Sequence, residues 1–368
     1  MPWILVVLFF LIKPVYCQTI DSARHQPYID IAKKIVSAAL EDQRGYELLR
    51  ELCQIGPRLS GSENSSKAIQ WAKTKMLNMG LDLVRLQPVM VPHWVRGNVE
   101  QAKVIDTGEE LSIAALGGSV GTPIDGITAE VLEVQSFEEL KKRADEARGK
   151  IIFFNRPMDP TKTNTFAAYG EAVNQRVHGA KQAAKFGGVA ALVRSITTKY
   201  DDVPHVGTMF YSDSFPKIPA AAISLVGADT LSNAIKENSN SKVNLKLSCQ
   251  TLPNVKSYNV IGEITGLEKP QEIILIGGHF DSWDKGHGAH DDGACCIQIL
   301  EVLDLFKRLN IKPKRTIRCA LFINEENGLR GAKRYAQLAD SASTEIHVAA
   351  IEADRGAFTP RGFTVDSD

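Results

Sequence analysis

Residues 273–281 read Ile-Ile-Leu-Ile-Gly-Gly-His-Phe-Asp, and this stretch determines the fold we expect around it. Ile273–Ile276 is a nearly unbroken apolar run, which is typical of a parallel strand that is covered on both faces. His279 and Asp281 follow the run directly. The sequence therefore predicts a buried strand that ends in ligand-type side chains.

The segments that follow alternate between helices and strands. Apolar residues at helical spacing predict a helix that begins near Asp291 and Asp292. Residues 317–323 and 347–351 are expected to form strands, and residues 329–338 a helix between them. This alternation predicts an α/β fold with a mostly parallel sheet and helices on both faces.

Polar residues follow each of the three predicted strands. They are His279 and Asp281 after the first, residues 324–328 (Asn-Glu-Glu-Asn-Gly) after the second, and Glu352 and Asp354 after the third, with Asp291 and Asp292 at the start of the helix. The carboxyl ends of parallel strands lie along one edge of a sheet, where ligands bind. A single such pair is more often a solvated loop or a helix cap. An imidazole with several carboxylates suits zinc or a similar divalent ion.

Four motifs carry a resemblance to a known family. They are residues 277–283 (GGHFDSW), 291–294 (DDGA), 324–331 (NEENGLRG) and 352–354 (EAD). As a set, and in this order, they resemble the two-zinc aminopeptidase and glutamate carboxypeptidase family. The similarity runs from residues 56–62 (GPRLSGS) to near the C-terminus, and the middle of the chain resembles the protease-associated domain that this family inserts.

The resemblance implies a role for individual residues. His279 and Asp354 would bind one zinc ion, Glu326 would bind the second, and Asp291 would bridge both. Glu325 falls on the family's general base. Two close cations need an anionic bridge and lower the pKa of a water between them, and a free carboxylate can take the proton of that water.

Other polar residues near these motifs are left with open roles. Asp281 falls on the residue that orients the first histidine. Asp292 is expected to cap the helix or to support the ligands. His287 and His290 lie in a glycine-rich loop and are alternative ligands, although the resemblance gives them no such role.

The sequence departs from the family pattern at its C-terminus. The pattern includes a further histidine on the second zinc, downstream of the Glu-x-Asp segment. The chain ends 14 residues after Asp354, and no histidine follows His347. We therefore expect a C-terminally incomplete peptidase domain that lacks this ligand. It is either a fragment of a longer protein or a shortened form that holds the second metal weakly and is inactive or weakly active.

The resemblance and the local patterns divide the chain into regions. The zinc peptidase domain is expected at residues 45–114 and 236–368, and the protease-associated insert at residues 115–235. Within the insert, the patterns predict strands near 149–154, 188–193 and 219–224 and a helix at 170–186.

The first twelve residues form an apolar run that is too short to cross a bilayer as a helix. They match a signal peptide that ends at Cys17, and a buried strand is the alternative. Residues 18–44 are expected to form a surface helix or a removable pro-segment. Asn64-Ser65-Ser66 is a glycosylation sequon consistent with the secretory route.

The balance of charged residues and the spacing of the cysteines exclude some classes of function. The 368 residues contain 43 Lys and Arg and 43 Asp and Glu, which argues against nucleic-acid binding. Cys295, Cys296 and Cys319 are expected to pack in the core, because their spacing does not fit a zinc or redox motif.

The leading expectation is a secreted or lysosomal zinc exopeptidase that hydrolyses dipeptides or short peptides with free termini. The resemblance also implies a homodimer. Two alternatives stay open, namely a non-catalytic binding protein on the peptidase fold and a one-zinc aminoacyl cyclotransferase. Zinc content of the purified chain distinguishes the binding protein from the peptidase.

Overall fold

The structure is a computed structural model that describes residues 22–342, 344–354, 362 and 364–365. Helix α1 (Ser22–Glu41) belongs to a different unit from the chain that begins at Arg44. The predicted signal peptide lies outside the described residues. Within these ranges no helix has both the length and the apolar content that a membrane crossing needs.

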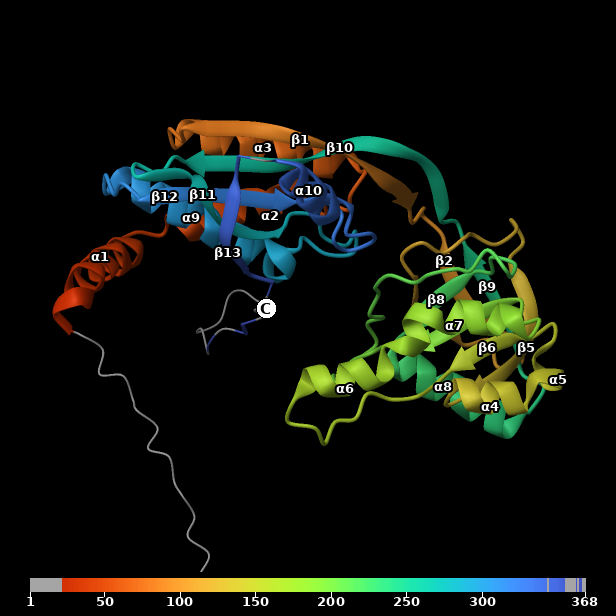
Figure 1. The fold of residues 1–368 in the computed structure, drawn as a ribbon. Coiled ribbons are helices and arrows are strands. Elements are labelled where there is room, and N and C mark those ends of the chain that lie inside the picture. The colour runs from red at the N-terminus through yellow and green to blue at the C-terminus, as the bar shows by residue number, and fades with distance from the viewer. Residues whose placement is uncertain (1–21, 343, 355–361, 363, 366–368) are drawn as a thin grey trace, which may run out of the picture. The chain divides into compact units, whose positions relative to one another are not determined.

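One sheet of five strands carries the motifs, in the order β1-β10-β12-β11-β13 (Figure 1). Its strands are β1 (Leu83–Val95), β10 (Gln250–Ile264), β11 (Lys269–His279), β12 (Arg315–Phe322) and β13 (Ile346–Glu352). β11 pairs in parallel with β12 and β13, but β10 is antiparallel to both β1 and β12. The sheet is therefore mixed, and the predicted parallel pairing is confirmed for β11, β12 and β13 but not for β10, which runs against its two neighbours. Only β11, β12 and β13 are joined by helical crossovers, which enforce parallel pairing.

Helices cover both faces of this sheet, as the sequence predicted. Alternate residues of a strand point to opposite faces. On one face, side chains such as Val260, Leu321 and Leu300 form a core with α2 (Arg44–Ile55), α3 (Glu63–Asn78) and α9 (Ala294–Arg308), and this core also contains Cys296 and Cys319. On the other face, Ile261 and Ala320 pack against Tyr335 of α10 (Arg330–Ser341).

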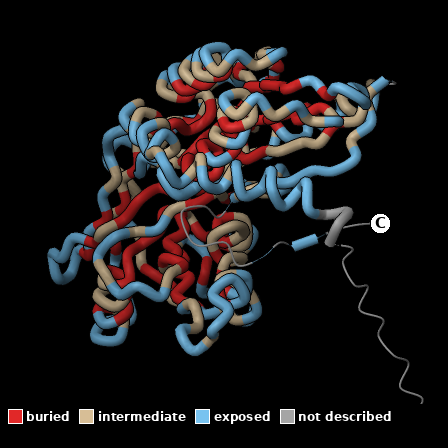
Figure 2. Tube along the Cα trace, turned by 90° about the vertical axis from the view of Figure 1, so that its left-hand side faces the viewer, coloured by how far each residue is buried: buried red, intermediate tan, exposed pale blue. Residues whose placement is uncertain are grey.

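A second sheet of eight strands lies between β1 and β10 in the sequence, in the order β3-β2-β9-β5-β6-β7-β8-β4. Its strands are β2 (Glu100–Val104), β3 (Glu110–Leu111), β4 (Ile113–Ala115), β5 (Ile127–Val134), β6 (Ile151–Phe154), β7 (Ala190–Arg194), β8 (Ala220–Ile223) and β9 (Lys242–Leu247). Its helices are α4 (Phe137–Lys142), α5 (Ala144–Ala147), α6 (Thr165–Ala172), α7 (Asn174–Lys185) and α8 (Leu225–Glu237). Each sheet has buried segments of its own (Figure 2).

The chain enters and leaves the second sheet through neighbouring strands. Val95 at the end of β1 pairs with Gln250 at the start of β10, and Glu100 of β2 pairs with Leu247 of β9. Between them, Gly97 has φ +75°, and a Cβ atom there would lie 2.2 Å from the Ser248 Oγ atom. Only glycine fits this crossing.

Candidate metal centre

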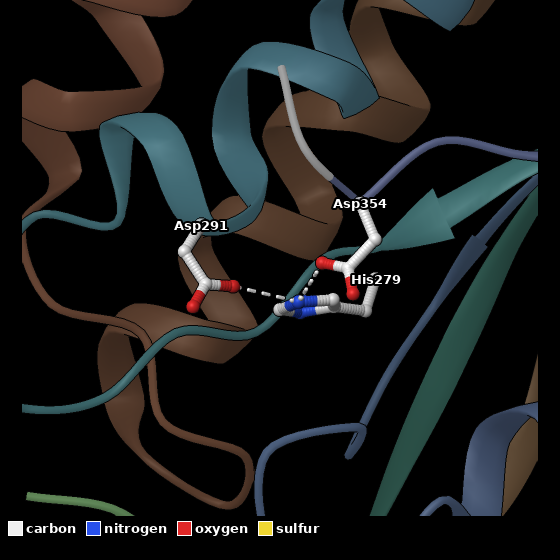
Figure 3. A group of neighbouring side chains, drawn as sticks. All are labelled: His279, Asp291 and Asp354. Carbon is white, nitrogen blue, oxygen red and sulfur yellow. Dashed lines mark hydrogen bonds and ion pairs between the residues drawn. The ribbon is translucent and has the colours of Figure 1, made fainter. Parts of the chain in front are cut away.

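Three side chains from distant parts of the chain meet at the end of β11 (Figure 3). The His279 Nε2 atom lies 2.9 Å from Asp291 Oδ1 and 3.2 Å from Asp354 Oδ1. One ligand atom from each residue lies within 4.8 Å of the others. His279 is buried, whereas the two carboxylates are more than half exposed. Two oxygens and one imidazole nitrogen thus face a common point.

The backbone of three separate segments positions these residues. His279 is the last residue of β11, and Asp291 lies in the short turn η1 (Ala289–Gly293) that precedes α9. Asp354 follows β13, and the Ala353 N–H beside it donates to the Gly277 carbonyl over 3.0 Å. The edge of the sheet therefore fixes the path of the chain at two of the three residues.

Hydrogen bonds couple the charge of His279 to the charges of the two aspartates. Burial alone would lower the pKa of His279, but hydrogen bonds with Asp291 and Asp354 raise this pKa to about 12. The hydrogen bond with His279 lowers the pKa of Asp291. The two carboxylates thus favour a positive charge beside the His279 Nε2 atom.

Two consecutive glutamates follow β12 at the same edge. The Glu325 N–H donates to Asp281 Oδ1 over 2.9 Å. Burial, assisted by the charges of neighbouring aspartates, raises the pKa of Glu325. Burial also raises the pKa of Glu326 to about 9, and the next largest cause is the charge of Asp291. The charge of Asp291 therefore acts on Glu326, although Glu326 lies outside the group of three.

Asp281 and Asp292 support the group from behind. The His279 Nδ1 atom lies 3.1 Å from the main-chain oxygen of Asp281 and 4.0 Å from the Asp281 Oδ1 atom, so the main chain makes the closer contact. Asp292 Oδ2 accepts a hydrogen bond from the main-chain N–H of His279 over 3.0 Å. Burial raises the pKa of Asp292 to about 7. No side-chain cap bond is present at the start of α9, so Asp292 supports His279 instead of capping the helix.

Arg58 is a site residue that motif reasoning did not single out. It is completely buried, and its Nε, Nη1 and Nη2 atoms donate to the carbonyls of Phe280 (2.8 Å), His287 (2.5 Å) and Gly288 (2.8 Å). An arginine in the Gly-Pro-Arg-Leu-Ser sequence was the available signal. This side chain fixes the loop between His279 and Asp291.

The residues fit a divalent cation. Imidazole nitrogen and carboxylate oxygen are zinc ligands. Among the described residues, the buried atoms Asp281 Oδ2 and Asp292 Oδ1 find no hydrogen-bond partner, which adds unbalanced negative charge beside the group. His287 and His290 are exposed and lie outside the group of three.

A cavity of about 490 Å³ lies beside Asp291. Asp291, Glu325 and Glu326 line it together with Trp283 and Leu329. The second sheet's region contributes Tyr169, Arg176, Val206, Gly207, Thr208 and Phe210, and Lys333 of α10 completes the charged lining. The lining thus combines three acidic side chains with two cationic ones.

Comparisons with known proteins agree with this architecture. Residues 259–366 match the model of peptidase family M28. The chain is similar to carboxypeptidase Q of Rattus norvegicus, with 42% identity over 91% of this chain and 70% of that protein. It is also similar to the crystal structure of a peptidase M28 precursor from Shewanella amazonensis, with TM-score 0.84 and 35% identity over 89% of this chain and 74% of that one. A zinc aminopeptidase from Bacillus subtilis shares the fold, with TM-score 0.61 and 22% identity over 84% of this chain and 68% of that one.

Proposed function

The chain belongs to peptidase family M28 and is a zinc metallopeptidase, and on this basis we propose that it is a secreted exopeptidase acting on dipeptides or short peptides. The observation that carries the proposal is the convergence of His279, Asp291 and Asp354, with Asp291 lining the same cavity as Glu325. Each of these residues comes from a different strand end or turn.

We assign the metal ligands residue by residue. His279 and Asp354 would hold one zinc ion, Glu326 would hold a second, and Asp291 would bridge the two. Asp291 contacts the His279 ring, it lines the cavity together with Glu326, and its charge acts on Glu326, which supports the bridging role. Bound zinc supplies Lewis acidity and lowers the pKa of water.

Glu325 is the proposed general base and acid. Its main chain is held by Asp281, while its side chain lines the cavity. Burial raises the pKa of its carboxyl group, which makes the carboxylate a better proton acceptor than an exposed glutamate. Glu325 would take the proton of the attacking water and deliver it to the leaving amine.

The second sheet's region forms part of the proposed substrate cavity. Arg176 and Lys333 add positive charge to the lining of the cavity, which suits the binding of a free terminal carboxylate. The assignment of residues 115–235 as a protease-associated insert stays a prediction, as does the homodimer. Export through the secretory pathway is proposed from the apolar N-terminal run, and the N-terminal sequence of the mature protein tests it.

Replacement of Glu325 by glutamine tests the chemistry. Glu325→Gln should bind zinc as the wild type does and lose peptide hydrolysis by about a hundredfold or more. Glu138→Gln, at an exposed position of helix α4, is the matched control and should keep full activity. Full hydrolytic activity in Glu325→Gln would refute the assignment.

A further inference from the structure

The loop of residues 280–290 joins two of the proposed metal ligands. His279 precedes it at the end of β11, and Asp291 follows it in η1. The path of the loop therefore determines how closely the two ligands approach each other. Arg58 holds this loop from the side of the first sheet, through the carbonyls of Phe280, His287 and Gly288.

A second arginine holds the middle of the same loop from the side of the second sheet. Arg96 directly follows β1, and its side chain is only 6% exposed. Its Nε and Nη2 atoms donate to the two carboxylate oxygens of Asp284, over 2.8 and 2.7 Å. Its Nη1 atom donates to Glu100 Oε1 over 3.0 Å and to the Ala115 carbonyl. Arg96 thus ties the loop to strands β2 and β4.

The neighbours of Asp284 reinforce this connection. Lys285 pairs with Glu100, which also accepts the Ala115 N–H over 2.7 Å. Trp283 packs against the core of the second sheet and leaves no room beside Gly117, where a Cβ atom would lie 1.9 Å from the Trp283 ring. Three consecutive loop residues are therefore held by the second sheet.

We propose, on the basis of the proposed function, that Arg96 is a positioning residue of the metal centre, through which the second sheet fixes residues 283–285 and so the separation of His279 and Asp291. The guanidinium group is suited to this role because its planar fork bonds both oxygens of Asp284 at once. Lysine at this position can make only single-point contacts, so Arg96→Lys should recover the function in part.

The test measures zinc affinity by competition with a chelator. Arg96→Met and Asp284→Asn should each weaken zinc binding by about tenfold or more, the usual effect of losing a group that orients metal ligands. In the zinc-free proteins, both variants should also speed amide hydrogen exchange at residues 283–290. Arg96→Lys should fall between Arg96→Met and the wild type in both measurements.

Arg194→Met is the matched control. Arg194 lies in the second sheet, and its Nη1 atom bonds Asp229 over 2.8 Å and Asn155 over 3.1 Å, neither of which belongs to the loop. Its loss should lower stability and leave zinc affinity and loop exchange unchanged. The control separates general destabilisation from an effect on ligand positions.

The outcomes distinguish this proposal from the proposed function. If Arg96→Met does not fold, Asp284→Asn tests the positioning role instead. Asp284 is partly exposed, and its substitution weakens only the contact between the arginine and the loop. Wild-type zinc affinity and exchange in a folded Asp284→Asn protein would overturn the positioning role. Failure of the wild type to bind zinc would instead refute the metal centre, and the exchange experiment would still test whether Arg96 holds the loop.

Discussion

Gly278 offers a sharp test of how tightly the metal centre is built. A Cβ atom added to Gly278 would lie 2.6 Å from Asp292 Oδ2 and 3.0 Å from the Ala353 carbonyl oxygen. Ordinary van der Waals contact begins at 3.4 Å, so the Asp292 carboxylate would have to retreat by about 0.8 Å. The same oxygen accepts the His279 N–H, and Ala353 precedes Asp354. Gly278→Ala therefore displaces the support of two proposed ligands.

The size of the effect follows from this displacement. Catalytic groups must be held to within about 0.5 Å, and a misplacement of about 1 Å costs about a hundredfold in rate. We expect Gly278→Ala to lower kcat/KM for a dipeptide by about a hundredfold and zinc affinity by about tenfold or more. Overpacking of this kind should reduce the free energy of unfolding by about 1–3 kcal/mol.

The neighbouring residue provides the control. A Cβ atom at Gly277 would lie 2.8 Å from the Phe322 ring and 2.9 Å from the Ala320 carbonyl oxygen, on the opposite face of β11. Gly277→Ala should lose similar stability and keep its zinc affinity. Steady-state kinetics, chelator competition and urea unfolding compare the two variants. If Gly278→Ala bound zinc and hydrolysed dipeptides as Gly277→Ala does, the reasoning would be refuted.

Three further predictions concern the cavity, acid stability and the metal. Arg176→Met should raise KM for a dipeptide by about tenfold or more, because it removes a charged hydrogen bond to the substrate. Lys185→Met, at an exposed position of α7, should leave KM unchanged. An unchanged KM in Arg176→Met would exclude Arg176 from substrate binding. The hydrogen bonds with Arg318 hold the pKa of Glu345 below its usual 4.5, so this pair stabilises the fold above about pH 4.5 and less as the pH falls. Urea unfolding of Glu345→Gln between about pH 5 and about pH 3 should therefore show a shallower loss of stability than the wild type, and equal slopes would contradict the contribution. Zinc at about 100 times its Kd should add about 2.7 kcal/mol to the free energy of unfolding, and a chelator should remove this gain. A melting temperature that changes with neither zinc nor chelator would argue against the site.

The positions of residues at strand ends could be predicted from the sequence because two local patterns coincide there. The apolar run 273–276 marks a buried strand, and His279 appears where that strand must end. The same reasoning places Glu325 and Asp354 at one edge of the sheet, where the structure has them. Their roles as ligand and base stay predictions.

Contacts between distant segments were not accessible in this way. Arg96 and Asp284 are 188 positions apart, and Arg58 donates to a carbonyl 230 positions away. The Gly-Pro-Arg-Leu-Ser sequence marks Arg58 but does not indicate which atoms its guanidinium group contacts, and no such motif marks Arg96. The antiparallel pairing of β1 with β10 escaped prediction for the same reason, since the second sheet separates the two strands in the sequence.

The paired crossing at Val95 and Gln250 has a consequence for the history of the fold. Because the two crossing strands are register neighbours, excision of residues 96–249 would leave ends that a short hairpin turn closes. The architecture therefore permits gain or loss of the whole second sheet as a module without a break in the first. Such an excision would also remove Arg96, Glu100 and Gly117, so a shorter relative would need a different anchor for the loop before Asp291. The second sheet could thus be removed without breaking the first sheet, although the proposed metal centre depends on contacts with it.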